Sequence, residues 1–308
     1  MPLTPRTNVG AVPWTDLLTK IRQKECVPFI GAGASFPTLP RGADLAEQLL
    51  QEDEAESRKP YPLADRGDLA KVCQYLAVTH GDSSWPKRKI ADRLSSGKTP
   101  DFDDPGEPHR ALANLRLPIY MTTNYDDFLF QALTRVGVKP RQEFARWTRA
   151  LLEDESSSFD DSWRPSPEEP VVFHLHGHTG VYRSMVASED DYLDFLVNMS
   201  KEIARTPRDP SERTMLPLPI RKAVRNYRLL FVGYGLADVN FRVILRSLVG
   251  SLEQSARQLH LSIQYSGSSP EELENYLEEY FRWTLQLNVF WGSARDFTQE
   301  MARRWTTQ

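Results

Sequence analysis

The chain has 308 residues, 40% of them hydrophobic and 26% charged, and its formal net charge is −4. This length and balance predict one large globular domain, or one domain with a sizeable insertion, and the lack of net positive charge argues against direct nucleic-acid binding. No apolar run approaches the roughly 20 residues that cross a bilayer, and the N-terminal residues lack the apolar core of a signal peptide, so we expect a soluble, cytoplasmic protein with no membrane partner.

The two cysteines, Cys26 and Cys73, lie far apart in the sequence, and neither flanks a cluster of histidines. Such a pair predicts neither a disulfide framework nor a four-cysteine zinc site.

Short apolar segments that end abruptly in small or polar residues are typical of buried parallel strands. The candidates are Val27–Ile30, Pro118–Met121, Val171–Leu175, Leu229–Val232, Leu259–Gln264 and Leu285–Phe290. Helical patterns follow several of them, at Ala43–Glu52, Asp127–Arg135, Val239–Leu252 and from Pro270 to about Arg282. Strands alternating with helices predict an α/β fold with a doubly wound, mostly parallel, Rossmann-like sheet.

The spacing of these strands is uneven, so inserted material must lie between them. We expect a single domain over residues 1–308 whose sheet core comes from about 25–42, 116–140, 170–190 and 226–300. Residues 43–115, with helical stretches at Asp68–Val78 and Lys87–Ser95, predict an inserted helical subdomain. Residues 153–169 are rich in acidic residues, serine and proline and predict an acidic loop, and 191–225 predict a helix followed by a Pro-rich stretch.

The first strand runs into Gly31-Ala32-Gly33-Ala34-Ser35. Tiny residues let the backbone approach a ligand, and amides at a following helix start can hold a phosphate. The segment lacks the Lys of a phosphate-binding P-loop and the third glycine of the dinucleotide fingerprint. A tight turn with no ligand is the competing interpretation.

The second strand ends in Thr122, Thr123, Asn124, Tyr125, Asp126 and Asp127. Ligands of open parallel sheets bind beyond the carboxyl ends of the strands, so these polar side chains are candidates for ligand contact. Asp126 or Asp127 could instead cap the following helix. Asn124 stands too early for that role, which favours a ligand contact for it.

The third strand ends in His174, His176 and His178, with Gly177 between the last two. Alternation would place the three imidazoles on one face if the strand continued that far. A histidine at a strand end is well suited to act as a general base, because its ordinary pKa is about 6.5. His174 is better explained as a buried residue with a hydrogen-bond partner, and a metal site on the three histidines is a further alternative.

Two later strand ends carry similar residues. The fourth strand is followed by Gly233, Tyr234, Gly235 and Asp238. Asp238 could instead only stabilise the positive end of the helix that follows. Trp291 precedes a glycine at the end of the last strand and could border a purine ring or belong to the core.

Taken in order, these segments resemble the sirtuin-like family, in particular its bacterial NAD-hydrolysing branch found in anti-phage defence. The resemblance is carried by Phe29 to Ser35, Thr122 to Asp126, His176-Gly177, and Val232 to Gly235 with Asp238. It implies a sirtuin-like NAD-binding domain over most of the chain.

The resemblance also implies roles for individual residues. Asn124 would orient the nicotinamide ribose and the attacking water, and His176 would be the base that acts on a ribose hydroxyl or on water. NAD would be held by Gly31, Ala32, Gly33, Ser35, Thr123, Asp126, Gly233, Tyr234, Gly235, Asp238 and Trp291.

Departures from the family pattern point away from protein deacylation. The deacylases carry Gln where Thr123 stands and often Ser where Gly235 stands, and they hold a zinc ribbon on paired cysteines that this chain cannot build. The sequence therefore predicts an NAD+ hydrolase that releases nicotinamide and ADP-ribose, with NAD as substrate and with no metal. The alternatives are an NAD-dependent protein deacylase, a non-catalytic NAD or ADP-ribose sensor, and a metal-dependent hydrolase.

An NAD-consuming enzyme that was always active would be toxic, so we expect regulation. The acidic segment 153–169 could cover the site, and the basic stretch Arg205–Arg228 could contact a partner subunit. The resemblance to defence proteins implies a homo-oligomer and a partner such as a ring ATPase or another component of a defence system.

Overall fold

The computed structural model describes residues 8–159, 163–204, 213–234, 260–264 and 271–306. These residues form a seven-stranded sheet in the order β3-β4-β2-β1-β5-β6-β7, and every neighbouring pair is parallel. The strands are β1 (Cys26–Ile30), β2 (Ile119–Thr122), β3 (Arg141–Phe144), β4 (Val171–His174), β5 (Arg228–Tyr234), β6 (His260–Gln264) and β7 (Leu287–Trp291). The predicted Rossmann-like sheet is confirmed, and in the described residues it is wholly parallel.

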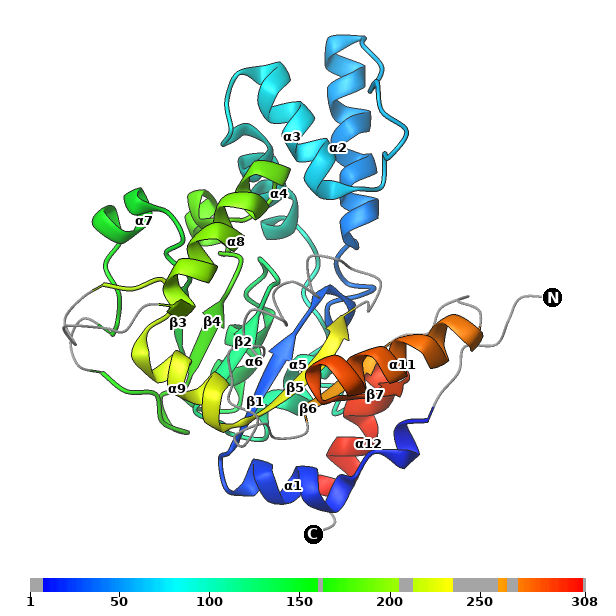
Figure 1. Cartoon of the computed structure of the whole chain (residues 1–308), viewed down its shortest axis with the longest axis vertical. Helices are drawn as coiled ribbons and strands as arrows, with labels where there is room; N and C mark the ends of the chain where they lie inside the picture. The colour runs from blue at the N-terminus through cyan, green and yellow to red at the C-terminus, as the bar shows by residue number, and fades with distance from the viewer. Residues whose placement is uncertain (1–7, 160–162, 205–212, 235–259, 265–270, 307–308) are drawn as a thin grey trace.

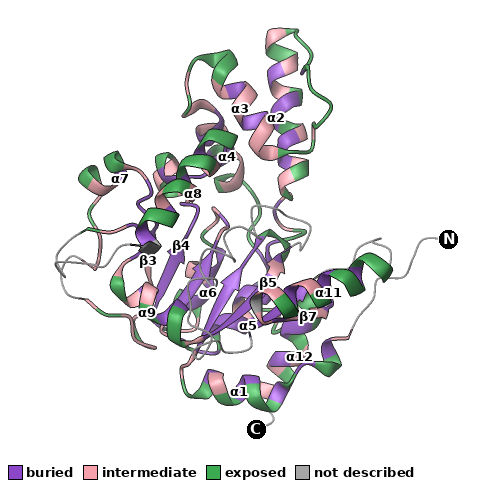
Figure 2. Cartoon of the chain, viewed as in Figure 1, coloured by how far each residue is buried: buried purple, intermediate pink, exposed green. Residues whose placement is uncertain are grey.

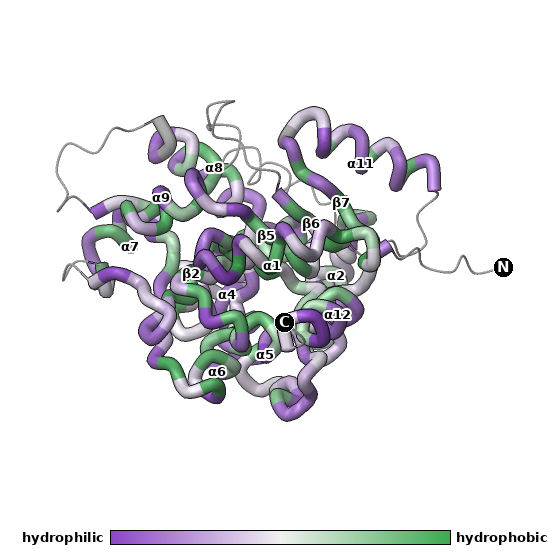
Figure 3. The backbone as a smooth tube through the Cα atoms, turned by 90° about the horizontal axis from the view of Figure 1, so that it is seen from below, coloured by the Kyte–Doolittle hydropathy of each residue, from purple (hydrophilic) through white to green (hydrophobic). Residues whose placement is uncertain are grey.

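Alternate strand residues face two separate hydrophobic cores, as a sheet covered on both sides requires. In β1, Val27 and Phe29 belong to one core, whereas Cys26 and Ile30 belong to the other. Helices α8 (Glu189–Ala204), α9 (Leu218–Asn226) and α11 (Glu271–Leu285) cover the first face. Helices α1 (Trp14–Arg22), α5 (Pro108–Ala113), α6 (Phe128–Arg135) and α12 (Ala294–Thr306) contribute to the second core. Figure 3 shows α8, α9 and α11 on one side of the strands and α5, α6 and α12 on the other side.

Helices α2 (Gly42–Ser57), α3 (Leu69–His80) and α4 (Trp85–Ser95) form a lobe beyond the carboxyl ends of the strands (Figure 1). The lobe has its own hydrophobic core, to which Leu49, Leu76 and Ile90 contribute, and Met185 and Ala187 from the chain after β4 also belong to this core. Exposed faces of α2 and α3 surround that core, whereas the strands are buried throughout most of their length (Figure 2).

The predicted subdomain 43–115 is longer than the lobe itself. Helix α5 lies within that range, but its residues Ala111 and Leu112 are buried in the core that α1, α6 and α12 share. The chain therefore returns to the sheet body before residue 115, because α5 packs its apolar side against the sheet and not against the lobe.

All six predicted strands are present, with bounds that differ by one to three residues. Strand β3 was not predicted, because the sequence Arg141-Gln142-Glu143-Phe144 is polar, as an edge strand permits. The predicted helix Val239–Leu252 lies outside the described residues. Short helical segments complete the chain: η1 (Val9–Ala11), η2 (Ala32–Ala34), α7 (Arg149–Asp154) and η3 (Thr179–Ser184).

The acidic segment 153–169 begins inside α7, and its described residues contact β3 and the residues that follow it. Ser157 Oγ donates to Glu143, and Arg146 donates to the carbonyl oxygens of Glu155 and Ser156. Among the described residues, this segment does not reach the cavity described below.

None of the helices in the part of the chain that the structure describes combines the length and the apolar character needed to cross a membrane.

Candidate functional site

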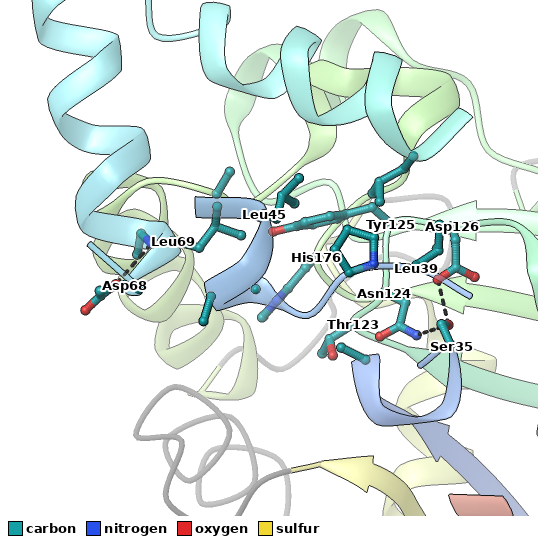
Figure 4. A pocket seen from close by; sticks show the side chains of 18 of the residues that line it. Ser35, Leu39, Leu45, Asp68, Leu69, Thr123, Asn124, Tyr125, Asp126 and His176 are labelled. Atoms are coloured by element: carbon teal, nitrogen blue, oxygen red, sulfur yellow. Dashed lines mark hydrogen bonds between the residues drawn. The ribbon is translucent and has the colours of Figure 1, made fainter. Parts of the chain in front are cut away.

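A cavity of about 860 Å³ lies between the carboxyl ends of the central strands and the helical lobe. Its size falls in the range of small-molecule sites. The sheet side is lined by residues that follow β1, β2 and β4, including Ser35, Asn124 and His176, and by Tyr234 at the end of β5. Leu45 and Leu69 line it from the lobe, and Figure 4 shows them around one space with Ser35, Asn124 and His176.

Glycines allow the turn after β1 to touch the end of β5 through the backbone. A Cβ on Gly31 or on Gly33 would lie 2.8 or 2.9 Å from the carbonyl oxygen of Gly233. Gly233 itself has a φ of +82°, and a Cβ there would lie 2.5 Å from the amide nitrogen of Ala34. The three glycines therefore have a packing reason for their small size, which is independent of any phosphate.

Asn124 comes directly after β2, in a turn whose backbone is fixed by its neighbours. Its amide N–H donates to Thr122 Oγ1 at 2.9 Å, and its carbonyl oxygen faces His174 Nδ1 at 3.0 Å. Its side-chain Nδ2 donates to Ser35 Oγ at 3.1 Å. The side-chain oxygen therefore turns away from Ser35, toward the cavity (Figure 4).

Ser35 links the turns after β1 and β2. Its hydroxyl donates to Asp126 Oδ2 at 3.0 Å, and its Oγ lies 3.5 Å from His109 Nε2. Burial raises the pKa of the Asp126 carboxyl, and the nearby His109 opposes this rise. Asp126 Oδ1 also accepts from the amide of Phe128 at 3.1 Å, so the predicted capping interaction and a place at the cavity occur together.

His176 lies just beyond the end of β4, between Tyr192 and Phe195. The imidazole meets both aromatic rings edge-on, with ring centroids 5.3 and 5.1 Å apart. Its Nε2 is buried without a hydrogen-bond partner, and burial lowers the pKa of His176 to about 3. At neutral pH the ring is therefore uncharged, and a lone pair is available to accept a proton or a hydrogen bond.

The other two histidines do not converge with His176. Strand β4 ends at His174, and Gly177 has a φ of +78°, so the alternation predicted through His178 stops. His174 is fully buried behind the Asn124 backbone, and His178 Nδ1 accepts from the amide of Gly180. In the described part of the chain, no group of three His, Cys, Asp or Glu side chains is arranged to hold a metal ion.

Tyr234 and Thr123 close the site between β1, β2 and β5. Tyr234 donates its hydroxyl hydrogen to the carbonyl oxygen of Ile30 at 2.8 Å, and Thr123 Oγ1 lies 2.9 Å from the same hydroxyl oxygen. Because both side chains line the cavity, this contact ties one wall to the end of β1.

The structure brings most of the predicted site residues to one place. Those that line the cavity are Ala32, Ser35, Thr123, Asn124, Asp126, His176, Gly233 and Tyr234. Gly31 and Gly33 support the turn behind it. Trp291 does not line the cavity: it is buried in the core of β7, and its indole N–H donates to Glu278. Gly235 and Asp238 lie outside the described residues.

The lobe supplies wall residues that sequence reasoning did not identify. Asp68 caps α3 by accepting from the amides of Ala70 and Lys71, and Lys71 forms an ion pair with Asp65. Among the described residues that line the cavity, Lys71 is the only Lys or Arg. No motif marks these positions, because they reach the site only through the way the lobe packs.

The fold and the site define a class: an α/β protein with a parallel, doubly wound sheet whose strand ends carry a small-molecule cavity with an Asn and a His. The family model described as "SIR2-like domain" matches residues 118–282, more than half of the chain. The chain therefore belongs to the SIR2-like domain family.

Two curated relatives carry the name NAD(+) hydrolase ThsA. The protein from Bacillus cereus is 24% identical over 261 residues, which cover 84% of this chain and 47% of the relative. The protein from Acinetobacter baumannii is 23% identical over 243 residues, with 79% and 43% covered. The chain thus spans about half the length of the curated relatives it matches. A solved structure of a Sir2 enzyme aligns with 96% of this chain and 98% of its own, at 12% identity and a TM-score of 0.40.

Proposed function

We propose that this chain is an NAD+ hydrolase that cleaves the nicotinamide–ribose bond and releases nicotinamide and ADP-ribose. One observation carries the proposal: the Asn124 amide and the His176 imidazole, from neighbouring strands β2 and β4, line a single cavity. Family membership and the names of the ThsA relatives support it.

The bond to be broken has a good leaving group, since nicotinamide leaves as a neutral molecule from a positively charged ring. The protein must hold the ribose, position one water and accept its proton. Asn124 is suited to the first task because its amide is fixed by Ser35 with the oxygen toward the cavity, where it can accept from a ribose hydroxyl.

His176 is suited to the proton transfer. It lines the cavity and is uncharged at neutral pH, so the imidazole can accept a proton from a ribose hydroxyl or from water. A positioned general base typically contributes about 10²–10⁴-fold to a rate. The aromatic rings of Tyr192 and Phe195 fix the plane of the imidazole, so the direction of its lone pair is set before substrate binds.

NAD binding is proposed for the cavity residues Ser35, Thr123, Asp126 and Tyr234, together with the backbone of the turn at Ala32. The proposal extends to Gly235 and Asp238, which follow β5 in the sequence. No contact with NAD is proposed for Trp291, because its side chain is buried away from the cavity.

We also propose a biological setting: NAD depletion as the effector step of a bacterial anti-phage defence system, with the chain acting as a cytoplasmic homo-oligomer together with a partner such as a ring ATPase. The names of the ThsA relatives support the NAD-hydrolysing step of this setting, and the oligomer and the partner rest on the sequence resemblance alone. A mass equal to one chain under active conditions, measured by gel filtration with light scattering, would contradict the oligomer.

The test is incubation of the purified protein with NAD, with and without candidate activators, followed by chromatography of the products. We expect equal amounts of nicotinamide and ADP-ribose, or cyclic ADP-ribose if water is excluded from the site. Nicotinamide release that depends on an acylated peptide would indicate a deacylase instead. Tight NAD binding without any product under all activating conditions would indicate a sensor.

A further inference from the structure

A buried pair of side chains lies behind the cavity and takes no part in the mechanism above. His109, at the start of α5, is 1% exposed, and its Nδ1 lies 2.7 Å from Glu107 Oε1. Glu107 is 5% exposed, and its other carboxylate oxygen accepts from the amide of Arg110 at 2.7 Å. The pair is thus fixed to the helix start by a second hydrogen bond.

The far side of the His109 ring faces the site. Its Nε2 lies 3.5 Å from Ser35 Oγ, and Ser35 is the residue that accepts the hydrogen bond from Asn124 Nδ2. A chain of contacts therefore runs from Glu107 through His109 and Ser35 to the Asn124 amide, across three separate segments of the sequence. Figure 4 shows its last links, the bonds that join Ser35 to Asn124 and to Asp126.

The direction of the hydrogen bonds follows from the chemistry of the groups. An ionised carboxylate only accepts, so a His109 ring beside Glu107 carries a proton on Nδ1, and its Nε2 accepts from Ser35 when the ring is neutral or donates to it when the ring is an imidazolium. Ser35 donates its single hydroxyl hydrogen to Asp126 Oδ2 at 3.0 Å, so its 3.5 Å contact with His109 is a hydrogen bond when Nε2 carries a proton and donates to Ser35 Oγ. In that arrangement one lone pair of the Ser35 oxygen accepts from His109 Nε2 and the other accepts from Asn124 Nδ2.

We propose that Glu107 and His109 are positioning residues: through Ser35 they hold the Asn124 side chain with its oxygen toward the substrate. The amide of Asn124 can rotate by half a turn about its last bond, which would present Nδ2 to the cavity. Ser35, held between Asp126 and His109, opposes that rotation because its oxygen needs the Nδ2 donor. The 3.5 Å contact is long, and contacts of this kind often shorten when substrate binds. This inference rests on the proposed function of Asn124.

Two substitutions at one position separate positioning from simple packing. His109→Asn keeps an amide near the place of Nδ1, so the contact with Glu107 survives while the reach to Ser35 is lost. His109→Gln places an amide near Nε2, so the contact with Ser35 survives. Both are polar and similar in size, so both are compatible with the buried site.

We expect His109→Asn to lower kcat for nicotinamide release by about tenfold or more, since small misplacements of reacting groups cost up to about 100-fold. Its Kd for NAD should change by less than about threefold, and His109→Gln should keep kcat within about threefold of the unsubstituted protein. Equal kcat values for the two variants, whether both high or both low, would overturn the positioning role.

A matched control is available in the lobe. His80 Nε2 lies 2.7 Å from Asp53 Oδ1, a second histidine–carboxylate pair that does not line the cavity. His80→Asn and His80→Gln should both leave kcat unchanged. A tenfold loss in these variants would show that the assay reports general loosening of the fold and would overturn the inference drawn from His109.

A readout that needs no turnover separates this inference from the proposed function. The side-chain NH₂ resonances of Asn124, assigned with Asn124→Ala, should be one sharp pair in the unsubstituted protein and in His109→Gln. In His109→Asn they should shift or broaden, because the amide then samples two orientations. Unchanged resonances in His109→Asn would refute the positioning role of His109 even if NAD is hydrolysed. If the resonances shift or broaden in His109→Asn but the unsubstituted protein releases no nicotinamide, the positioning of the Asn124 side chain is supported and the proposed function fails.

Discussion

The two walls of the cavity are built on different principles. The sheet wall joins residues far apart in the sequence through buried backbone contacts and short hydrogen bonds, such as those of Gly233 with Gly31 and of Asn124 with Ser35. The lobe wall is continuous in sequence, and ion pairs on its partly exposed faces connect its helices and loops, for example Arg66 with Glu47 and Glu54.

The two walls therefore have different roles, since the sheet wall carries the candidate reacting groups and the lobe wall completes the shape of the cavity. Partly exposed ion pairs contribute little to stability, so the lobe wall can adjust or vary at small cost. The sheet wall cannot adjust in this way, because Ser35, Asn124 and His176 are buried and the hydrogen bonds of Ser35 join separate segments of the chain. We therefore expect substitutions in the sheet wall to abolish the reaction or the fold, and substitutions in the lobe to alter mainly affinity.

The largest expected effect is on catalysis. His176→Ala and Asn124→Ala should each lower the rate of nicotinamide release by about 10²–10⁴-fold, because a positioned base and an oriented acceptor are lost. NAD binding should largely persist, since neither side chain holds the pyrophosphate in the proposed complex. Leu69→Ala in the lobe wall is the control and should change KM more than kcat. A rate within twofold of the unsubstituted protein in both sheet-wall variants would show that these residues are not catalytic.

The second effect is acid destabilisation of the sheet body. Burial lowers the pKa of His174 and His176 to about 3 and that of His260 to about 4. Below pH 6.5 the unfolded chain binds protons at these positions, whereas the folded protein does not until much lower pH. Stability is therefore lost as the pH falls from about 6.5 toward 4, by up to about 1.4 kcal/mol per pH unit for each group.

Burial raises the pKa of Asp126, so the folded protein binds a proton at this carboxyl more readily than the unfolded chain does. As the pH falls toward the ordinary pKa of a carboxyl, this uptake stabilises the fold and offsets part of the loss caused by the histidines. Urea unfolding at pH 7, 6 and 5 measures the net slope. His260→Asn should reduce this slope by the amount that corresponds to the uptake of about one proton on unfolding. A free energy of unfolding that stays constant from pH 7 to pH 5 would contradict the assignment of neutral buried imidazoles.

The third effect concerns the joint between lobe and sheet body. Lys87 Nζ lies 2.8 Å from Asp191 Oδ1, and both residues are buried, with Asp191 also accepting from the amides of Ala187 and Ser188. Lys87→Met leaves a buried carboxylate without its cation and should lower the free energy of unfolding by about 3 kcal/mol.

The matched control is Arg88→Met. Arg88 pairs with Asp82 at 2.7 Å, and both side chains of that pair are more than 40% exposed. Its loss should cost less than about 1 kcal/mol. Equal destabilisation by the two substitutions, measured by urea unfolding, would mean that the lobe is not anchored through Lys87.

The smallest effect compares two glycines with nearly the same φ angle. Gly233 has a φ of +82° and touches Ala34, whereas Gly137 has a φ of +81° and open space around the added Cβ. Gly137→Ala should therefore cost about 1 kcal/mol for the conformation alone, and Gly233→Ala about 2 kcal/mol or more because the neighbouring turn must also move. Thermal unfolding of both variants measures the difference between the two losses of stability. Equal losses of stability would contradict the packing explanation for Gly233.

The sheet wall could be predicted from the sequence to a large extent. The apolar strands and the small or polar residues at their ends are local patterns, so Asn124 and His176 were identified without coordinates. The polar edge strand β3 was missed because it lacks the apolar run of a buried strand.

Other parts depend on contacts that no local pattern encodes. His109 approaches Ser35 from 74 residues away, and Lys71 reaches the cavity only through the packing of the lobe. The predicted role of Trp291 at a purine ring is not supported, because its residue type fits a strand-end ligand contact and a core position equally well.

The central claim is that Asn124 and His176 act on the same NAD molecule. Single-turnover release of nicotinamide, measured for Asn124→Ala, His176→Ala and the double variant, tests it most directly. We predict that the double variant is about as slow as the slower single variant, since groups that act as a unit are not additive. A double variant whose rate loss equals the product of the two single losses would show that the two side chains act independently and would contradict the account.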